Sequence, residues 1–130
     1  MSVEHVRQPE GSSLCGHSVL AMVRGITLEK AVEMMGHRRG TRTRELVAAL
    51  GSQALYRRLT VIGRRPLLDV PDPCVLKVRW SEKSRSHFVL RVGYVIHDPE
   101  FPHGFDLLQW TGWVSQMRGR ITSYLPVRLP

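Results

Sequence analysis

Apolar residues recur three and four positions apart along the first part of the chain, which is the spacing of one face of an α-helix. This spacing predicts a first helix over residues 13–24, with Ser12 or Ser13 as its N-cap and Gly25 as its stop signal. Cys15 would then lie in the first turn of a largely buried helix. The apolar face of that helix would consist of Leu14, Val19, Met22 and Val23.

Two further helices are predicted directly after the first. Thr27 can cap the second helix, and Gly36 would end it. Either Thr41 or Thr43 can open the third helix, and Gly51 would close it. The residues expected to face the core from these two helices are Leu28, Ala31, Val32, Met35, Leu46, Val47 and Leu50.

The pattern then changes to the two-residue alternation of β-strands. Residues 74–80 alternate most clearly and predict a half-buried strand with the sequence CVLKVRW. Further strands are expected at 54–62, 87–92, 94–98, 105–110 and 121–129, with a polar turn at 81–86 and short helical turns at 67–68 and 113–118. Helices followed by strands predict an α+β fold in which a helical layer packs on an antiparallel sheet.

The composition is that of a globular protein. With 130 residues, one domain covering residues 1–130 is expected, and a hydrophobic fraction of 42% is enough for a core. No apolar run approaches the length of a membrane span, and the first residues lack the order of a secretory signal. We therefore expect a cytoplasmic protein without a membrane partner, or one exported without a classical signal. Cys15 and Cys74 are then expected to be free thiols.

The net charge of +8 comes mostly from arginine. Such a charge suits a nucleic acid, an acidic protein or an anionic surface as partner, and it also suits a plain compositional bias. The arginines occur as scattered pairs, for example at 38–39, 57–58 and 64–65, without a dense basic run or interleaved aromatic residues. This pattern does not favour nucleic-acid binding. Of the partners that this charge suits, an acidic protein therefore remains the candidate.

Cys15 is the first candidate for chemistry. Near a helix N-terminus, unpaired backbone N–H groups and the helix dipole favour a thiolate, which is the nucleophilic form of cysteine. A cysteine at such a place can also be a small apolar core residue. The nucleophilic interpretation therefore needs a base from elsewhere in the chain.

A predicted hairpin over residues 87–98 could supply that base. If its turn is centred between Val92 and Gly93, His87 lies directly opposite Asp98. Opposed residues on antiparallel strands point to the same face, with Cβ atoms about 5 Å apart. The register would place a carboxylate beside an imidazole, and a bulge at Gly93 would shift it.

An Asp–His pair beside a helix-start cysteine would form a cysteine-nucleophile triad. The imidazole would take the thiol proton, and the carboxylate would orient the imidazole. The backbone N–H of Cys15 and the side-chain amide of Gln8 are candidate oxyanion donors. His17 lies two positions from Cys15 on another helix face, and His97 would point away from His87. The spacing of these groups matches no standard zinc site, so neither a metal nor a cofactor is expected.

Several of these motifs occur in the same order in a known family. They are Gln8, Cys15-Gly16 before an apolar helix, Gly36, Gly40-Thr41, His87-Phe88-Val89-Leu90 and His97-Asp98-Pro99. Over roughly residues 8–110 the chain resembles the C39 family of papain-fold cysteine peptidases, which includes the leader-cleaving peptidases of bacteriocin exporters. The resemblance implies a papain-like fold with Cys15 as nucleophile and His87 as base. It also implies that Asp98 is the orienting acid and Gln8 the oxyanion donor.

The chain departs from the family pattern around the cysteine. Leu14 stands where many members have Asp, Gly16-His17 stands in place of Gly-Pro, and Gln8 is one residue further from the cysteine than in the exporter peptidases. We expect a cysteine-dependent hydrolase, a peptidase or isopeptidase, that acts on a peptide or protein through a thioester. The alternatives are an acyl transferase or deamidase with the same triad, and a non-catalytic or effector-type module that binds an acidic protein or nucleic acid.

Overall fold

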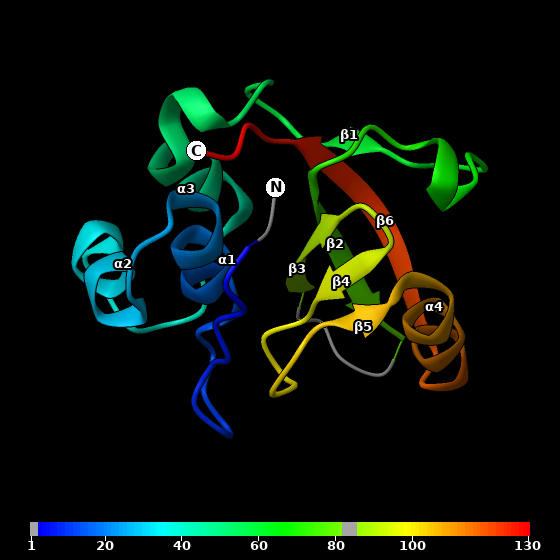
Figure 1. Cartoon of the computed structure of the whole chain (residues 1–130), viewed down its shortest axis with the longest axis horizontal. Coiled ribbons are helices and arrows are strands. Elements are labelled where there is room, and N and C mark those ends of the chain that lie inside the picture. The colour runs from blue at the N-terminus through cyan, green and yellow to red at the C-terminus, as the bar shows by residue number, and fades with distance from the viewer. Residues whose placement is uncertain (1–2, 82–85) are drawn as a thin grey trace.

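The computed structural model describes residues 3–81 and 86–130 of the chain. Over these residues it has the expected α+β class, with four α-helices and a six-stranded antiparallel sheet (Figure 1). The strand order across the sheet is β1-β6-β2-β3-β4-β5. Helices α1, α2 and α3 lie together on one side of the sheet, and α4 lies on the other (Figure 1).

The three predicted helices are present. They are α1 (Cys15–Arg24), α2 (Leu28–Met35) and α3 (Thr43–Leu50). Gly25 and Gly36 have φ angles of 70° and 81°, and these left-handed conformations end α1 and α2 as predicted. Thr27 caps α2, because its hydroxyl accepts a hydrogen bond from the N–H of Lys30 at 3.1 Å.

The predicted serine N-cap of α1 is wrong. The helix begins at Cys15, so its N-cap is Leu14, which has no polar side-chain atom. The hydroxyl of Ser12 instead accepts the N–H of Leu14 at 3.4 Å. The later start leaves Cys15 as the first residue of the helix, where backbone N–H groups lack intrahelical partners.

Four predicted strands are found close to their expected places. They are β2 (Cys74–Trp80), β3 (Ser86–Val92), β4 (Val95–His97) and β6 (Gly119–Pro126). The first expected strand shrinks to β1 (Thr60–Val61), because bends over residues 55–58 separate it from an isolated bridge between Ala54 and Val127. The helical turn expected at 67–68 is confirmed by a 3-10 turn over Leu67–Asp69. The polar turn expected at 81–86 falls largely on 82–85, outside the described residues.

The strand predicted at 105–110 is wrong for most of its length. Only β5 (Phe105–Asp106) is extended, and α4 (Leu107–Gln116) follows it. The carboxylate of Asp106 caps this helix by accepting the N–H groups of residues 108 and 109 at 3.1 and 3.2 Å. Leu107, Trp110 and Val114 are buried, and their spacing of three and four residues is that of one helix face.

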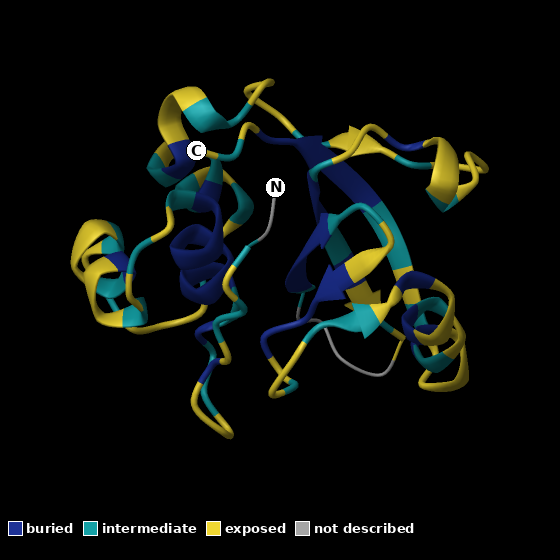
Figure 2. Ribbon diagram, in the orientation of Figure 1, coloured by how far each residue is buried: buried dark blue, intermediate teal, exposed yellow. Residues whose placement is uncertain are grey.

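Both faces of the sheet are buried, as Figure 2 shows for the central strands. On one face, Val75 and Phe88 pack with α1 and α3. On the other face, Leu76 and Val89 pack with α4. Between its two ends α1 is buried throughout, so Cys15 is carried by an element that the core holds rigidly. Among the helices of the described ranges, none is long and apolar enough to cross a membrane.

The turn between β3 and β4 differs from the predicted one. Val92 pairs with Val95, so the turn consists of Gly93 and Tyr94. Gly93 has a φ of 63°, which suits the first central position of a two-residue hairpin turn and costs glycine nothing. The carboxylate of Asp72 also accepts the N–H of Gly93 at 2.8 Å.

This turn shifts the hairpin register, so the predicted pairing of His87 with Asp98 is wrong. Leu90 pairs with His97, and Asp98 lies one residue beyond the end of β4. The alternation of a strand does not fix the direction of a side chain outside the ladder. Asp98 can therefore turn toward His87 from the bend that follows β4, and it does so.

Candidate active site

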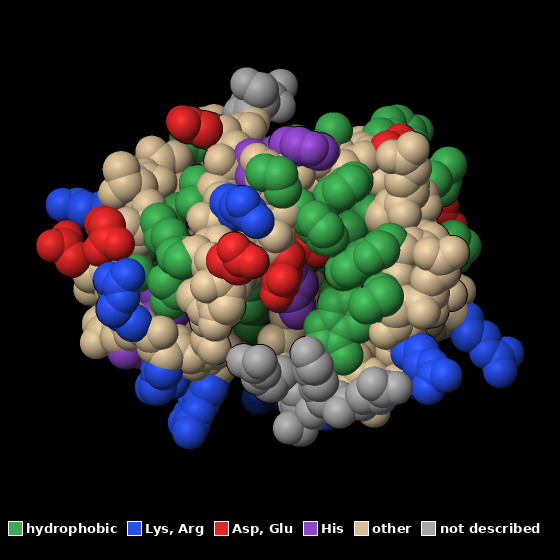
Figure 3. All heavy atoms as spheres, turned by 90° about the horizontal axis from the view of Figure 1, so that it is seen from below, with side chains coloured by type: hydrophobic (Ala, Val, Ile, Leu, Met, Phe, Trp, Pro, Cys, Tyr) green, Lys and Arg blue, Asp and Glu red, His purple; other side chains and the backbone are tan. Residues whose placement is uncertain are grey.

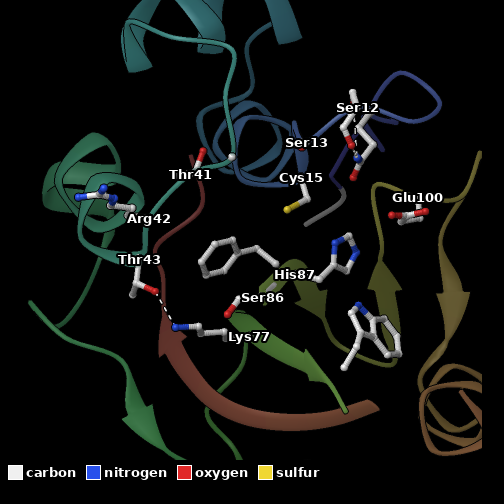
Figure 4. Close-up of a pocket in the computed structure, with 14 residues that line it drawn as sticks. Ser12, Ser13, Cys15, Thr41, Arg42, Thr43, Lys77, Ser86, His87 and Glu100 are labelled. Carbon is white, nitrogen blue, oxygen red and sulfur yellow. Dashed lines mark hydrogen bonds between the residues drawn. The ribbon is translucent and has the colours of Figure 1, made fainter. Parts of the chain in front are cut away.

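Cys15, His87 and Asp98 form a continuous chain of side chains in the structure. Cys15 extends from the start of α1 and His87 from β3 into one cleft (Figure 4). The Nε2–H of His87 donates to Oδ1 of Asp98 at 2.6 Å. The thiol of Cys15 is hydrogen-bonded to the same imidazole, so Nδ1 is the ring nitrogen left for it. The structure thus brings the three residues together in the predicted order, although by another hairpin register.

The sulfur of Cys15 also receives two backbone donors. The N–H groups of Gly16 and Phe88 are both hydrogen-bonded to it. The first belongs to the N-terminal turn of α1, and the second follows His87 on β3. These two donors lie on the backbone, so no residue type in the sequence could have indicated them.

Asp98 is fully buried, and three donors surround its carboxylate. Besides His87, the N–H of Glu100 donates to Oδ1 at 3.0 Å, and the indole Nε1–H of Trp110 donates to Oδ2 at 3.0 Å. Burial would raise the pKa of this carboxyl, but the hydrogen bond and charge of His87 outweigh it, and the pKa is lowered. Asp98 is therefore ionised and held in one orientation.

The sequence places Trp110 near the last strands, where packing in the core or at the rim is favoured over lining a substrate cleft. Its hydrogen bond to Asp98 is not predicted. As the fourth residue of α4, Trp110 lies beneath the His87–Asp98 pair and is only 1% exposed. The signal was available in the spacing of Leu107, Trp110 and Val114, which marks a helix whose buried face carries the indole.

The electrostatics of the site favour a thiolate and an imidazolium. Burial alone would lower the pKa of His87, but its bonds to Asp98 and Cys15 raise that pKa to about 10. Burial would likewise raise the pKa of Cys15, but the hydrogen bond and charge of His87 lower it below the ordinary value. Cys74 differs, because its burial in β2 raises the pKa of its thiol to about 12. Both cysteines are unpaired in the structure.

Gln8 lines the same cleft and is itself only 6% exposed. Its side-chain NH₂ donates to the carbonyl of Ser12 at 2.7 Å and, over a longer 3.4 Å, to the Ser12 hydroxyl. Its backbone N–H donates to the carbonyl of Pro99 at 2.8 Å and so ties this segment to the bend that carries Asp98. Gln8 and Cys15 thus line the same cleft, and the role of Gln8 as oxyanion donor stays a prediction.

The cleft has a volume of about 420 Å³. One wall is the loop before α3, which packs against Gly16 so closely that a Cβ on that glycine would lie 2.7 Å from Cβ of Thr41. His17 fixes this wall from behind, because its Nε2–H donates to the carbonyl of His37 at 2.7 Å. The Thr41 hydroxyl lies 3.4 Å from Nδ1 of His17. His17 is therefore a buried structural residue that does not contact the sulfur, as expected.

Glu45 of α3 holds the same loop by several hydrogen bonds. Its carboxylate accepts two from Arg39, both at 3.0 Å, one from His37 at 2.9 Å, and one from the backbone N–H of Arg42 at 2.9 Å. The bonds from Arg39 are the main cause that lowers the pKa of Glu45 to about 2. The wall opposite His87 is thus anchored to a helix.

His97 pairs with Leu90 of β3, and its side chain contacts the N-terminal segment. Its Nδ1 lies 3.0 Å from Nδ1 of His5, and the His5 Nε2–H donates to the carbonyl of Phe101 at 2.7 Å. Burial and the neighbouring His5 lower the pKa of His97 to about 4. Over residues 3–81 and 86–130, no three His, Cys, Asp or Glu side chains gather as a metal-ligand set.

The surface charge has no single focus on the face that Figure 3 shows. Lys and Arg side chains lie mainly toward its edges, and acidic side chains lie near its middle beside a band of hydrophobic ones (Figure 3).

No protein-family model matches this sequence, and no curated protein matches it. The resemblance to the C39 peptidases therefore rests on the sequence motifs alone.

Proposed function

We propose that this protein is a cysteine-dependent hydrolase of the papain-like, C39-like type, which cleaves an amide bond in a peptide or protein through a thioester. The observation that supports this most is the chain from Cys15 through His87 to the buried Asp98, with 2.6 Å between His87 Nε2 and Asp98 Oδ1. A nucleophile at a helix start, a base that touches it and a third group that orients the base are the parts of a thiol hydrolase. The antiparallel sheet packed on α1 is compatible with a papain-like arrangement.

In the first half of the reaction the thiolate of Cys15 attacks the carbonyl carbon of the substrate amide. The C–S bond forms, and the carbonyl electron pair moves onto oxygen. The N–H of Cys15 and the side-chain amide of Gln8 are the candidate donors for this oxyanion, and the Gln8 NH₂ would exchange its longer bond, to the Ser12 hydroxyl, for it. His87 then gives its Nδ1 proton to the leaving nitrogen, the C–N bond breaks, and a thioester on Cys15 remains.

In the second half water replaces the amine. His87, now neutral, takes a proton from the water, and the hydroxide attacks the thioester carbonyl. Collapse of the second tetrahedral intermediate breaks the C–S bond and releases the acid. The thiolate and imidazolium that result are the starting state of the enzyme, so protons and electrons balance over the cycle.

Asp98 and Trp110 serve this cycle without touching the substrate. The carboxylate holds Nε2 protonated, which leaves Nδ1 as the nitrogen that exchanges its proton with Cys15. The indole N–H of Trp110 occupies the other carboxylate oxygen and so keeps Asp98 from turning away. The burial of all three side chains excludes water from the imidazole–carboxylate bond.

A peptide-library digestion tests the proposal. Wild type and Cys74→Ala should generate new peptide termini, which mass spectrometry detects, because Cys74 lies in the sheet away from the cleft. Cys15→Ala and His87→Ala should generate none while remaining folded by circular dichroism. Hydrolysis by Cys15→Ala at the wild-type rate would contradict the proposal. An acyl group on Cys15 that hydroxylamine releases would identify the thioester directly.

A further inference from the structure

One side of the cleft carries positive charge that no carboxylate of the described residues neutralises. Lys77 of β2 and Arg42 before α3 both line it, together with Thr43 (Figure 4). The ammonium of Lys77 donates to the hydroxyl of Thr43 at 2.9 Å, and the Lys77 side chain is half-buried. The ion pairs found among the described residues involve neither Lys77 nor the guanidinium of Arg42.

This charge lies close to the catalytic pair. Lys77 is the cross-strand partner of Phe88, which directly follows His87 on β3. Phe88 also gives its backbone N–H to the sulfur of Cys15. Cross-strand neighbours are about 5 Å apart at Cβ, so the Lys77 side chain starts one residue position away from the reacting groups. A group bound there would be part of the same substrate molecule whose amide meets Cys15.

A half-buried ammonium with a single hydroxyl acceptor is incompletely solvated. Burial lowers the pKa of Lys77, and the nearby charge of Arg79 adds to that shift. An anion that entered the cleft would replace the lost hydration and accept the remaining N–H donors of the ammonium. Thr43 fixes the direction of the ammonium, whereas the exposed Arg42 side chain points away from Lys77 (Figure 4).

We propose that Lys77 and Thr43 form a subsite that binds a carboxylate of the substrate, next to the amide bond that Cys15 attacks. This inference rests on the proposed hydrolase function and specifies its substrate class. The carboxylate is either an acidic side chain or the free C-terminal carboxylate of a peptide, since both present the same two oxygens to an ammonium. Glu100 lines the opposite side of the cleft, so a bound acidic substrate is oriented with its carboxylate away from that residue.

Peptidyl vinyl sulfones, which alkylate an active-site thiolate, test the subsite. In a set of four-residue probes, Asp, Asn or Lys occupies each position in turn, and intact-mass spectrometry measures the rate of labelling at Cys15. Wild type should prefer Asp to Asn at one position by about 10- to 100-fold, the range of a charge-assisted hydrogen bond. Lys77→Met should abolish that preference, and Lys77→Glu should turn it toward Lys. A second arm compares hydrolysis of peptides with a free C-terminal carboxylate and with a C-terminal amide, and so identifies the source of the carboxylate.

Arg79→Met is the matched control, because it removes the same charge two residues along β2 from a side chain that does not line the cleft. It should keep the preference for Asp. Equal labelling by all probes in wild type together with equal hydrolysis of the free-acid and amide peptides would overturn the subsite while leaving Cys15 as the nucleophile. An Asp preference that survives in Lys77→Met would overturn it as well. If no probe labels Cys15 in the folded protein, the proposed hydrolase function fails and this inference fails with it.

Discussion

Asp98→Asn is the substitution that separates charge from shape in the site. An asparagine oxygen can still accept the N–H groups of His87 and Glu100, which both point at Oδ1. Its NH₂ group would then face the indole N–H of Trp110, donor against donor, because Trp110 donates to Oδ2. We expect the variant to lose the buried charge and to leave two buried donors unpaired.

The structure gives the size of both effects. A buried polar group without a partner costs about 1–3 kcal/mol, so two unpaired donors should lower the free energy of unfolding by about 2–6 kcal/mol. The imidazole of His87, whose pKa is raised to about 10, also loses its main favourable partner. Since each pKa unit corresponds to about 1.4 kcal/mol, even a modest share of the shift lost with Asp98 should move the midpoint of Cys15 alkylation upward by about one unit or more.

A double-mutant cycle with Trp110→Phe isolates the donor conflict. In wild type, Trp110→Phe removes a hydrogen bond, whereas in the Asp98→Asn background it removes an opposing donor. The double variant should therefore be more stable than the sum of the two single losses, by at least about 1 kcal/mol. Trp113→Phe on the same helix is the control, because Trp113 packs edge-to-face on Trp80 and Phe101. Its loss should be additive with that of Asp98→Asn.

Urea unfolding measures the free energies, and alkylation by iodoacetamide over a pH series measures the midpoint. Additive losses for Asp98→Asn and Trp110→Phe would refute the statement that the indole holds the carboxylate. An unchanged alkylation midpoint in Asp98→Asn would refute the statement that Asp98 sets the charge of His87.

Two other predictions concern the surroundings of the site. Gly16→Ala should destabilise the protein by about 1–3 kcal/mol and slow Cys15 alkylation, because the new Cβ would lie 2.7 Å from Cβ of Thr41. A second substitution, Thr41→Gly, should restore both the stability and the alkylation rate. A Gly16→Ala protein as stable as wild type would contradict the close contact. The folded-state pKa of His97 is about 4 and its unfolded value is near 6.5. Between these pH values the unfolded chain therefore binds a proton at His97 that the folded protein does not bind. The free energy of unfolding in urea should thus fall by up to about 3 kcal/mol as the pH drops from 6.5 to 4, and His97→Gln should flatten that slope; equal slopes for both proteins would contradict the assignment.

Local patterns in the sequence were enough for the helices before the sheet. Thr27, Gly25 and Gly36 are residue types whose backbone preferences apply at a single position, and each is found in its predicted role. The segment after residue 104 was harder, because Phe105 to Trp110 also alternates in a way that suits a strand. The cap at Asp106 decided in favour of a helix, and the longer spacing through Val114 would have shown it.

The site was predicted more completely than the hairpin that carries it. The turn was misplaced because glycine at position 93 suits either side of a turn centre, and only the packed sheet selects the register. Asp98 still meets His87 because it lies outside the ladder, where strand alternation does not apply. The donors on Cys15 from Gly16 and Phe88 and the indole on Asp98 depend on how α1 and α4 pack against opposite faces of the sheet, which no local pattern contains.

The measurement that tests the central claim most directly is the rate of Cys15 alkylation by iodoacetamide from pH 5 to pH 10, followed by peptide mass spectrometry. A thiolate–imidazolium pair predicts a midpoint below the ordinary value of 9.0, and a rate near neutral pH above that of the urea-unfolded chain. Cys74, buried and with its pKa raised to about 12, serves as the internal control and should stay unlabelled until the protein unfolds. A midpoint at or above 9, or a folded-state rate no faster than the unfolded one, would contradict the account.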